Sequence, residues 1–266
     1  MNVISRMSIS EFDWIDWLAR FRVRAALPPR GFEGPVGLSA FRKDLLARSI
    51  AVFQLGEAGE GRLAAEIQVF GGPFINDSYK QACSLFVREE GRHALELLLI
   101  LRFLGHSPLQ KSRANTAFVS LRRMLGIKTK LFVLLIAEVV GVVFYSSLAF
   151  VFDESNEPAL ADAFSSISLE EIDHLIFHLD FFIAACGDGQ PNKIFISLAF
   201  ALSAMPMIVW ASCLHSAAFE HRFSFAMRMI KSGTKVVKAS LCYLLKSSPD
   251  YREVRFRLAN CLSICL

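Results

Sequence analysis

Apolar residues recur every three or four positions along almost the whole chain, and no stretch alternates with the period of two that a half-buried strand requires. The pattern therefore predicts an all-α protein. Glycine and proline mark the breaks, most clearly at 28–29, 71–73 and 105. A first helix is predicted from about Ser10, as N-cap, to Ala25.

Four long helices are predicted in the middle of the chain, and short loops join them in pairs. Their expected ranges are 39–70, 76–105, 128–152 and 158–187. A helical connector over about 112–125 separates the two pairs. Because short loops join antiparallel neighbours, we expect two helical hairpins that together form a four-helix bundle.

The last quarter of the chain differs in character from the bundle. Residues 192–231 are predicted as one apolar helix with a kink at Pro206, and a basic amphipathic helix is predicted to begin at Gly233. The predicted division has three parts. They are an N-terminal helical extension, the bundle, and C-terminal helices packed on the bundle, over 1–38, 39–190 and 191–266.

Composition raises the question of a membrane. Hydrophobic residues make up 53% of the 266 residues, and mean hydropathy is +0.41. The segments 131–152 and 194–219 are each about long enough to cross a bilayer. We interpret the first as a core helix because it contains Glu138, and we favour core for the second, with membrane association as the alternative. No signal peptide and no C-x-x-C pair is present, so we expect a cytoplasmic protein.

Charge is distributed unevenly. Residues 191–266 hold 10 Lys and Arg against 3 Asp and Glu, whereas residues 1–190 hold 19 against 22. A basic surface at the C-terminal end is suited to an anionic carrier protein, a membrane surface or a second subunit of a homodimer. An ordinary solvated face is the alternative. Nucleic acid is not among the predicted partners.

Two Glu-x-x-His motifs carry the strongest chemical signal, Glu90 to His93 and Glu171 to His174. A spacing of three places the carboxylate and the imidazole on the same side of a helix, and apolar positions share that side in both helices. Burying such groups is costly unless they are paired, and a metal ion pairs with both. One motif alone is expected by chance on a solvated helix, but two on two apolar faces predict a metal site.

A bundle site with two metals needs one glutamate from each of the two remaining helices. Glu138 stands alone in an apolar run of the third long helix. In an antiparallel hairpin, residues at equal height are equidistant from the loop centre. Glu138 and Glu171 are 33 positions apart, and their midpoint lies within the predicted loop after residue 153.

The first long helix offers three candidates, Glu57, Glu60 and Glu66. Glu57 is also 33 positions from Glu90, and their midpoint lies between residues 73 and 74, within the predicted loop that joins the first two long helices. Glu60 places the midpoint at an acceptable position, whereas Glu66 places it inside the next helix. We therefore predict Glu57 as the ligand, keep Glu60 as its rival, and expect Glu66 at the surface or supporting a ligand.

The resulting ligand set resembles that of the ferritin-like di-iron carboxylate superfamily, which includes ferritins, rubrerythrins and di-iron oxidases and oxygenases. The predicted metal ligands are Glu57, Glu90, His93, Glu138, Glu171 and His174. The resemblance covers about 39–186 and implies a ferritin-like four-helix bundle with extra terminal helices. It also implies two iron ions, with manganese or a mixed-metal pair as alternatives. The chain is longer than a ferritin subunit and lacks the cysteine pairs of a rubrerythrin.

Four further residues are candidates for supporting the metals. Glu89 and Glu170 each precede a motif glutamate and can orient a histidine through its free ring nitrogen, or else face solvent. His178 lies one turn beyond the second motif, and Tyr145 lies two turns beyond the lone glutamate of its helix. For both, plain core packing is the alternative. No role is predicted for His215.

Three functions are compatible with these observations. The leading one is a di-iron oxidase or oxygenase that activates dioxygen to oxidise an apolar or aromatic small molecule, with an external electron donor. The second is a ferroxidase or iron-handling protein without an organic substrate. The third is a membrane-peripheral interaction module in which the acidic and histidine pairs are structural.

Overall fold

Every regular element of the structure is a helix, within the part of the chain that is described. The computed structural model describes residues 14–58, 61–72, 74–110, 126–187, 189–216, 219, 222–246 and 250–262. These residues form nine helices and no strand, so the all-α prediction is confirmed. The predicted N-cap Ser10 and the predicted connector over 112–125 lie outside the described residues.

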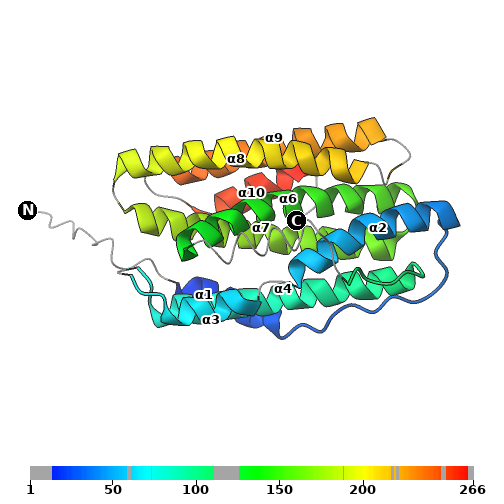
Figure 1. Ribbon diagram of the computed structural model, residues 1–266, viewed down its shortest axis with the longest axis horizontal. Coiled ribbons are helices and arrows are strands. Elements are labelled where there is room, and N and C mark those ends of the chain that lie inside the picture. The colour runs from blue at the N-terminus through cyan, green and yellow to red at the C-terminus, as the bar shows by residue number, and fades with distance from the viewer. Residues whose placement is uncertain are drawn as a thin grey trace, which may run out of the picture.

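Two groups of antiparallel helices form the centre of the molecule. In the first, α2 (Ala40–Glu57) and α3 (Gly61–Val69) pack on α4 (Asp77–Phe103). In the second, α6 (Ile127–Glu154) pairs with α7 (Pro158–Cys186). The long helices run along the long axis of the molecule (Figure 1). Contacts between α4 and α7 join the two groups, as a four-helix bundle requires.

Local signals explain the ends of α4. The side chain of Asn76 accepts a hydrogen bond from the backbone N–H of Tyr79, which caps the first turn. The helix ends shortly before Gly105, whose φ of +81° lies in the left-handed region that glycine adopts without strain. Both ends were predicted from the sequence.

The prediction of a single helix over 39–70 is wrong. The chain forms α2 as far as Glu57 and resumes as α3 at Gly61. Three glycines fall within residues 56–61, and each costs about 1 kcal/mol relative to alanine in a helix interior. The break therefore falls where helix propensity is lowest, and it leaves Glu57 at the C-terminal end of a helix.

The prediction of a single helix over 192–231 is also wrong. The helix α8 (Gln190–Ser216) ends earlier, and α9 (Arg222–Leu245) packs back along it (Figure 1). Gly233 does not begin a helix but lies buried in the middle of α9. A Cβ added there would lie 2.7 Å from two carbons of Ile208 in α8. Glycine thus allows α8 and α9 to approach closely.

Two shorter helices complete the described fold. The helix α1 (Ile15–Ala25) packs on α4, and α10 (Tyr251–Leu262), which was not predicted, packs on α9 and α7. Figure 1 shows α1, α3 and α4 along one side, α6 and α7 in the middle, and α8 and α9 on the other side.

Two described helices, α6 and α8, are long and apolar enough to cross a membrane by length and composition. They differ in burial. The most apolar stretch of α6 is 83% buried, whereas that of α8 is 28% buried. The interpretation of α6 as a core helix is therefore confirmed, and the same interpretation of α8 holds for one of its faces only.

Candidate metal centre

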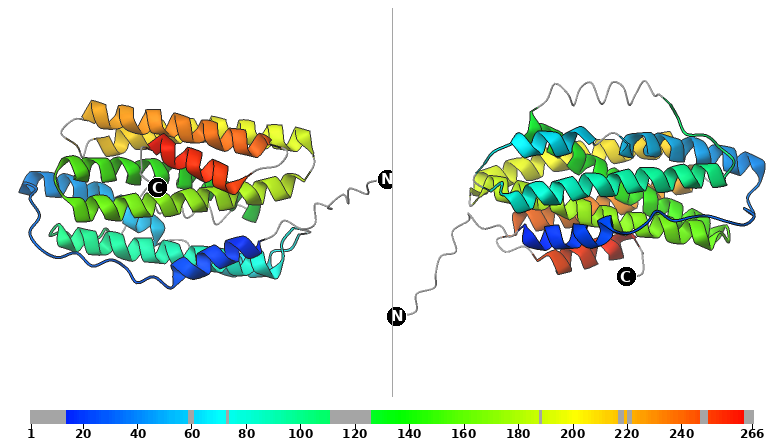
Figure 2. Two further views of the ribbon diagram at one scale, coloured as in Figure 1. Left: turned by 180° about the vertical axis from the view of Figure 1, so that it is seen from behind. Right: turned by 90° about the horizontal axis from the view of Figure 1, so that it is seen from below.

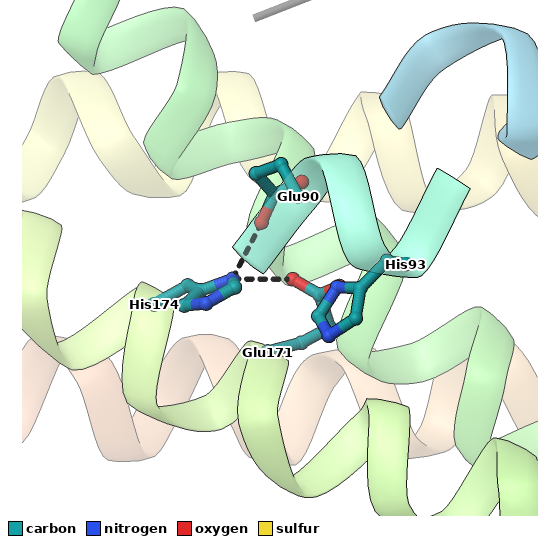
Figure 3. Close-up of side chains that lie close together, drawn as sticks. All are labelled: Glu90, His93, Glu171 and His174. Atoms are coloured by element: carbon teal, nitrogen blue, oxygen red, sulfur yellow. Dashed lines mark hydrogen bonds and ion pairs between the residues drawn. The ribbon is translucent and has the colours of Figure 1, made fainter. Parts of the chain in front are cut away.

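The two Glu-x-x-His motifs meet between α4 and α7 (Figure 3). One donor atom from each of the four side chains lies within 4.8 Å of the others, and all four side chains are buried. The contacts cross between the helices. His93 Nδ1 is 2.9 Å from Glu171 Oε1, and His174 Nδ1 is 2.7 Å from Glu90 Oε1. The four residues therefore have a near-twofold arrangement, with each histidine facing the glutamate of the other helix.

Three donor atoms of this cluster have no hydrogen-bond partner among the described residues, whereas His174 Nδ1 lies at a hydrogen-bonding distance of 3.1 Å from Glu171 Oε2. The three are Glu90 Oε1, His93 Nδ1 and Glu171 Oε1, and all are buried. Metal–ligand bonds of about 2.1 Å at right angles put neighbouring donor atoms about 3.0 Å apart. The observed separations of 2.7, 2.9 and 3.1 Å agree with that spacing. The residues therefore fit a metal ion.

Two more glutamates adjoin the cluster from the other two helices. Glu138 of α6 is buried, and its Oε2 lies 3.9 Å from His174 Nδ1. Glu57 of α2 lies within hydrogen-bonding reach of Glu90, and its Oε1 accepts a 2.5 Å hydrogen bond from Tyr145 Oη. The structure thus brings all six predicted ligands to one buried place. Their role as ligands stays a prediction.

Without a cation, bound protons balance the charge of this cluster. Burial and then repulsion from Glu90 raise the pKa of Glu57 well above its usual range, and burial and then Glu171 do the same for the pKa of Glu138. Although burial lowers it, the carboxylate of Glu171 raises the pKa of His93 to about 10. Once these protons leave, as metal binding requires, four carboxylates with two neutral imidazoles carry four negative charges. Two divalent cations cancel them.

The predicted supporting residues Glu89 and Glu170 contact the far sides of the two imidazoles. His93 Nε2 lies 2.6 Å from Glu170 Oε2, and His174 Nε2 lies 3.5 Å from Glu89 Oε1. Both glutamates are buried, so the solvent-facing alternative does not apply. A carboxylate on one ring nitrogen fixes the ring and leaves the other nitrogen toward the cluster.

Two arginines that the sequence reasoning missed neutralise these outer glutamates. Arg92 Nη2 lies 2.7 Å from Glu170 Oε2, and Arg24 Nε of α1 lies 3.0 Å from Glu89 Oε1. Arg24 also forms an ion pair with Asp173 of α7. A buried carboxylate is costly unless it is paired, so these arginines stabilise the outer layer of the site.

The sequence around the two motifs contains a pattern that includes one of these arginines, Arg92. Residues 89–93 and 170–174 both read Glu-Glu-x, then a charged residue, then His. The charged residue is Arg92 in one segment and Asp173 in the other. Arg92 forms an ion pair with Glu170 directly. Asp173 instead forms an ion pair with Arg24, and Arg24 in turn forms one with Glu89. Nothing in the sequence identified Arg24 as the partner.

Of the other candidate residues, His178 lies beside the cluster and Glu66 does not. His178 is fully buried, and its Nε2 lies 3.6 Å from Glu138 Oε1, too far for a hydrogen bond. Burial lowers the pKa of His178 to about 3, so the ring is a neutral neighbour of the cluster. Glu66 lies elsewhere, with its side chain 40% exposed and paired to Lys130. Glu60 lies outside the described residues.

No protein-family model matches the chain, and comparisons with curated proteins and with solved structures find no match. The fold and the site by themselves define the class: an all-helical protein with a buried carboxylate–histidine cluster that can bind a metal ion. The ferritin-like superfamily remains a resemblance that rests on the ligand pattern.

Proposed function

We propose that the protein holds two iron ions in this cluster and activates dioxygen to oxidise an apolar or aromatic small molecule. The observation that carries the proposal is the convergence of four glutamates and two histidines from four helices on one buried place. Carboxylate and imidazole ligands suit iron, and manganese has similar requirements. When bound, the two ions supply the electrons and the Lewis acidity needed to reduce dioxygen.

The side chains have distinct parts in this proposal. Glu90 and Glu171 lie between the two histidines, and they would hold both ions. His93 and His174 would each hold one ion. Tyr145 Oη donates a hydrogen bond to Glu57 Oε1, which leaves the other carboxylate oxygen for a metal ion.

Two aromatic side chains pack against His174 and favour an apolar substrate. The ring of Phe86 lies 4.8 Å from that of His174, and the ring of Phe21 lies 5.9 Å from it. Both phenylalanines are fully buried, so they exclude water from this side of the site. Two ferrous ions supply only two electrons, so repeated turnover of an oxygenase needs an external electron donor.

The test is metal analysis combined with oxygen consumption. We expect about two irons per chain in the wild-type protein, a loss of most of this iron in the Glu90→Ala/His174→Ala double variant, and no loss in a Glu66→Ala control. Excess Fe²⁺ with dioxygen should stop at about two irons per chain, because the proposal includes no mineral store. Two tightly bound metals in the double variant would overturn the site, and mineralisation of many irons would favour iron storage instead.

A further inference from the structure

A second polar feature lies outside the metal cluster, where α1, α7 and α10 meet. It is a surface pocket of about 460 Å³. Both α1 and α10 lie on the face that Figure 2 shows from behind. We call it the arginine pocket, after the polar residues that line it: Arg20, Arg24, Asp173, Tyr251, Arg252 and Arg255.

The arginine pocket has an excess of positive charge. Four arginines face one carboxylate, Asp173, which leaves three positive charges among the lining residues. That carboxylate is already occupied. It accepts hydrogen bonds from Tyr251 Oη at 2.6 Å and Arg255 Nε at 2.8 Å, and it also pairs with Arg24. Asp173 therefore does not neutralise the two other arginines.

Those two arginines are available to a ligand. Neither Arg20 nor Arg252 has a carboxylate within ion-pair distance among the described residues. The guanidinium carbon of Arg20 lies 3.8 Å from the centre of the Tyr251 ring, which holds the group at the pocket without using its N–H donors.

The rest of the pocket is ordered by the protein itself. Glu89 and Asp173 hold Arg24, and Asp173 also holds Arg255, so few side chains must be ordered when a ligand binds. Two apolar side chains, Val23 and Phe256, complete the lining and are 70% and 58% exposed. An apolar group attached to an anion can cover them.

We propose that the arginine pocket binds a small organic anion, a carboxylate or a phosphate monoester carried on an apolar group. Guanidinium groups match the planar, bidentate geometry of both anions. The volume lies within the range of small-molecule sites. The proposal does not depend on the metal function, although Arg24 places the pocket next to Glu89, which contacts a histidine of the metal cluster.

Calorimetric titration of the full-length protein as purified tests this site. The probes are hexanoate, hexyl phosphate, inorganic phosphate and hexylammonium. Trp17 fluorescence gives a second readout, because its ring lies 5.2 Å from that of Tyr251. We expect both hexyl anions to bind, inorganic phosphate to bind more weakly, and hexylammonium not to bind. The tighter of the two hexyl anions identifies the headgroup.

Two double variants separate the pocket from general charge attraction. Arg20→Gln/Arg252→Gln removes the two free guanidinium groups, and we expect about tenfold weaker binding or more. Arg22→Gln/Arg257→Gln removes the same charge from the same two helices but outside the pocket, and should leave binding unchanged. Equal losses in both variants, or binding of hexylammonium as tight as that of hexanoate, would overturn the proposal.

Discussion

At the scale of single residues, the two motif histidines are held from both sides. His93 contacts an inner glutamate through Nδ1 and Glu170 through Nε2. His174 does the same with Glu90 and Glu89. The 2.6 Å contact with Glu170 determines which ring nitrogen of His93 faces the cluster. The contact of Glu89 with His174 is longer, at 3.5 Å, and is not a hydrogen bond.

The choice between Glu57 and Glu66 is a direct test at this scale. Glu57 lies at the C-terminal end of α2, where the helix dipole favours a cation nearby. Glu57→Ala should weaken metal binding by about 10–100-fold or more, whereas Glu66→Ala should not change it. Competition with a chelator of known affinity measures both. Equal weakening by the two substitutions would show that our loop-centre argument is wrong.

His215 has a partner that the sequence did not reveal, and it predicts a dependence of stability on pH. Its Nδ1 lies 2.6 Å from Ser49 Oγ, and burial lowers its pKa to about 4. The unfolded residue titrates near pH 6.5. Between about pH 6.5 and 4 the unfolded state therefore binds a proton that the folded state does not. The contribution of His215 to the free energy of unfolding should fall as the pH decreases through this window and stay constant above it.

The variant His215→Asn keeps a hydrogen-bonding group near Ser49 but cannot titrate. Between pH 7 and 4.5, its loss of unfolding free energy should be smaller than that of the wild type by about 2–3 kcal/mol. Urea unfolding at both pH values measures the difference. His106→Asn is the control and should keep the wild-type loss. An unchanged loss in His215→Asn would contradict the assignment.

At the scale of elements, α8 and α9 pack closely because a small residue lies at their contact. Gly233 of α9 is buried against the side chain of Ile208 in α8. A substitution there has two opposing effects. Alanine improves helix propensity by about 1 kcal/mol, but its methyl group overpacks the contact, which typically costs about 1–3 kcal/mol.

Gly233→Ala should therefore lower the free energy of unfolding by about 1 kcal/mol in the wild-type background. In an Ile208→Ala background the clash is absent, so the same substitution should be neutral or stabilising. Urea unfolding of the four proteins in this cycle gives both values. The same destabilisation in both backgrounds would show that contact with Ile208 is not the cause.

At the scale of the whole molecule, α8 leaves an apolar face uncovered in the described structure. Residues 194–216 contain no Asp, Glu, Lys or Arg. The neighbouring helix α9 contains five basic residues and no acidic one. A large, contiguous apolar face on the surface of a soluble protein usually marks an interaction site. We call the uncovered face of this helix the α8 face. It is formed by the exposed side chains of Ile194, Phe195, Leu198, Leu202, Val209, Trp210 and Leu214.

We propose that the α8 face rests on an anionic membrane surface, with α9 supplying basic charge beside it. The protein should then sediment with phosphatidylcholine vesicles that contain phosphatidylglycerol. Phe195→Gln/Leu202→Gln should reduce this binding at least several-fold, and the control Phe41→Gln/Val69→Gln, at exposed positions of α2 and α3, should not. A change from dimer to monomer in the first variant, without vesicle binding by the wild type, would identify a second copy as the partner.

Features that depend on neighbours along the chain could be predicted from the residues alone. The helices α4, α6 and α7 follow from apolar periodicity and local end signals such as Asn76. The two motifs follow from a spacing of three on one helix, which places both side chains together whatever the rest of the molecule does. The pairing of Glu57 with Glu90 and of Glu138 with Glu171 at equal heights along the helices was predicted from the short loops. A short loop allows little sliding of one antiparallel helix along the other.

Where the long apolar segments divide into separate helices, and which distant charges pair, became clear from the fold. Periodicity looks alike in α8 and α9, and only the packing of α9 on α8 shows that they are two helices lying side by side. Arg24 and Asp173 are 149 positions apart in the chain. Electrostatic attraction and close packing act through space, so partners of this kind become definite only when the fold brings them together.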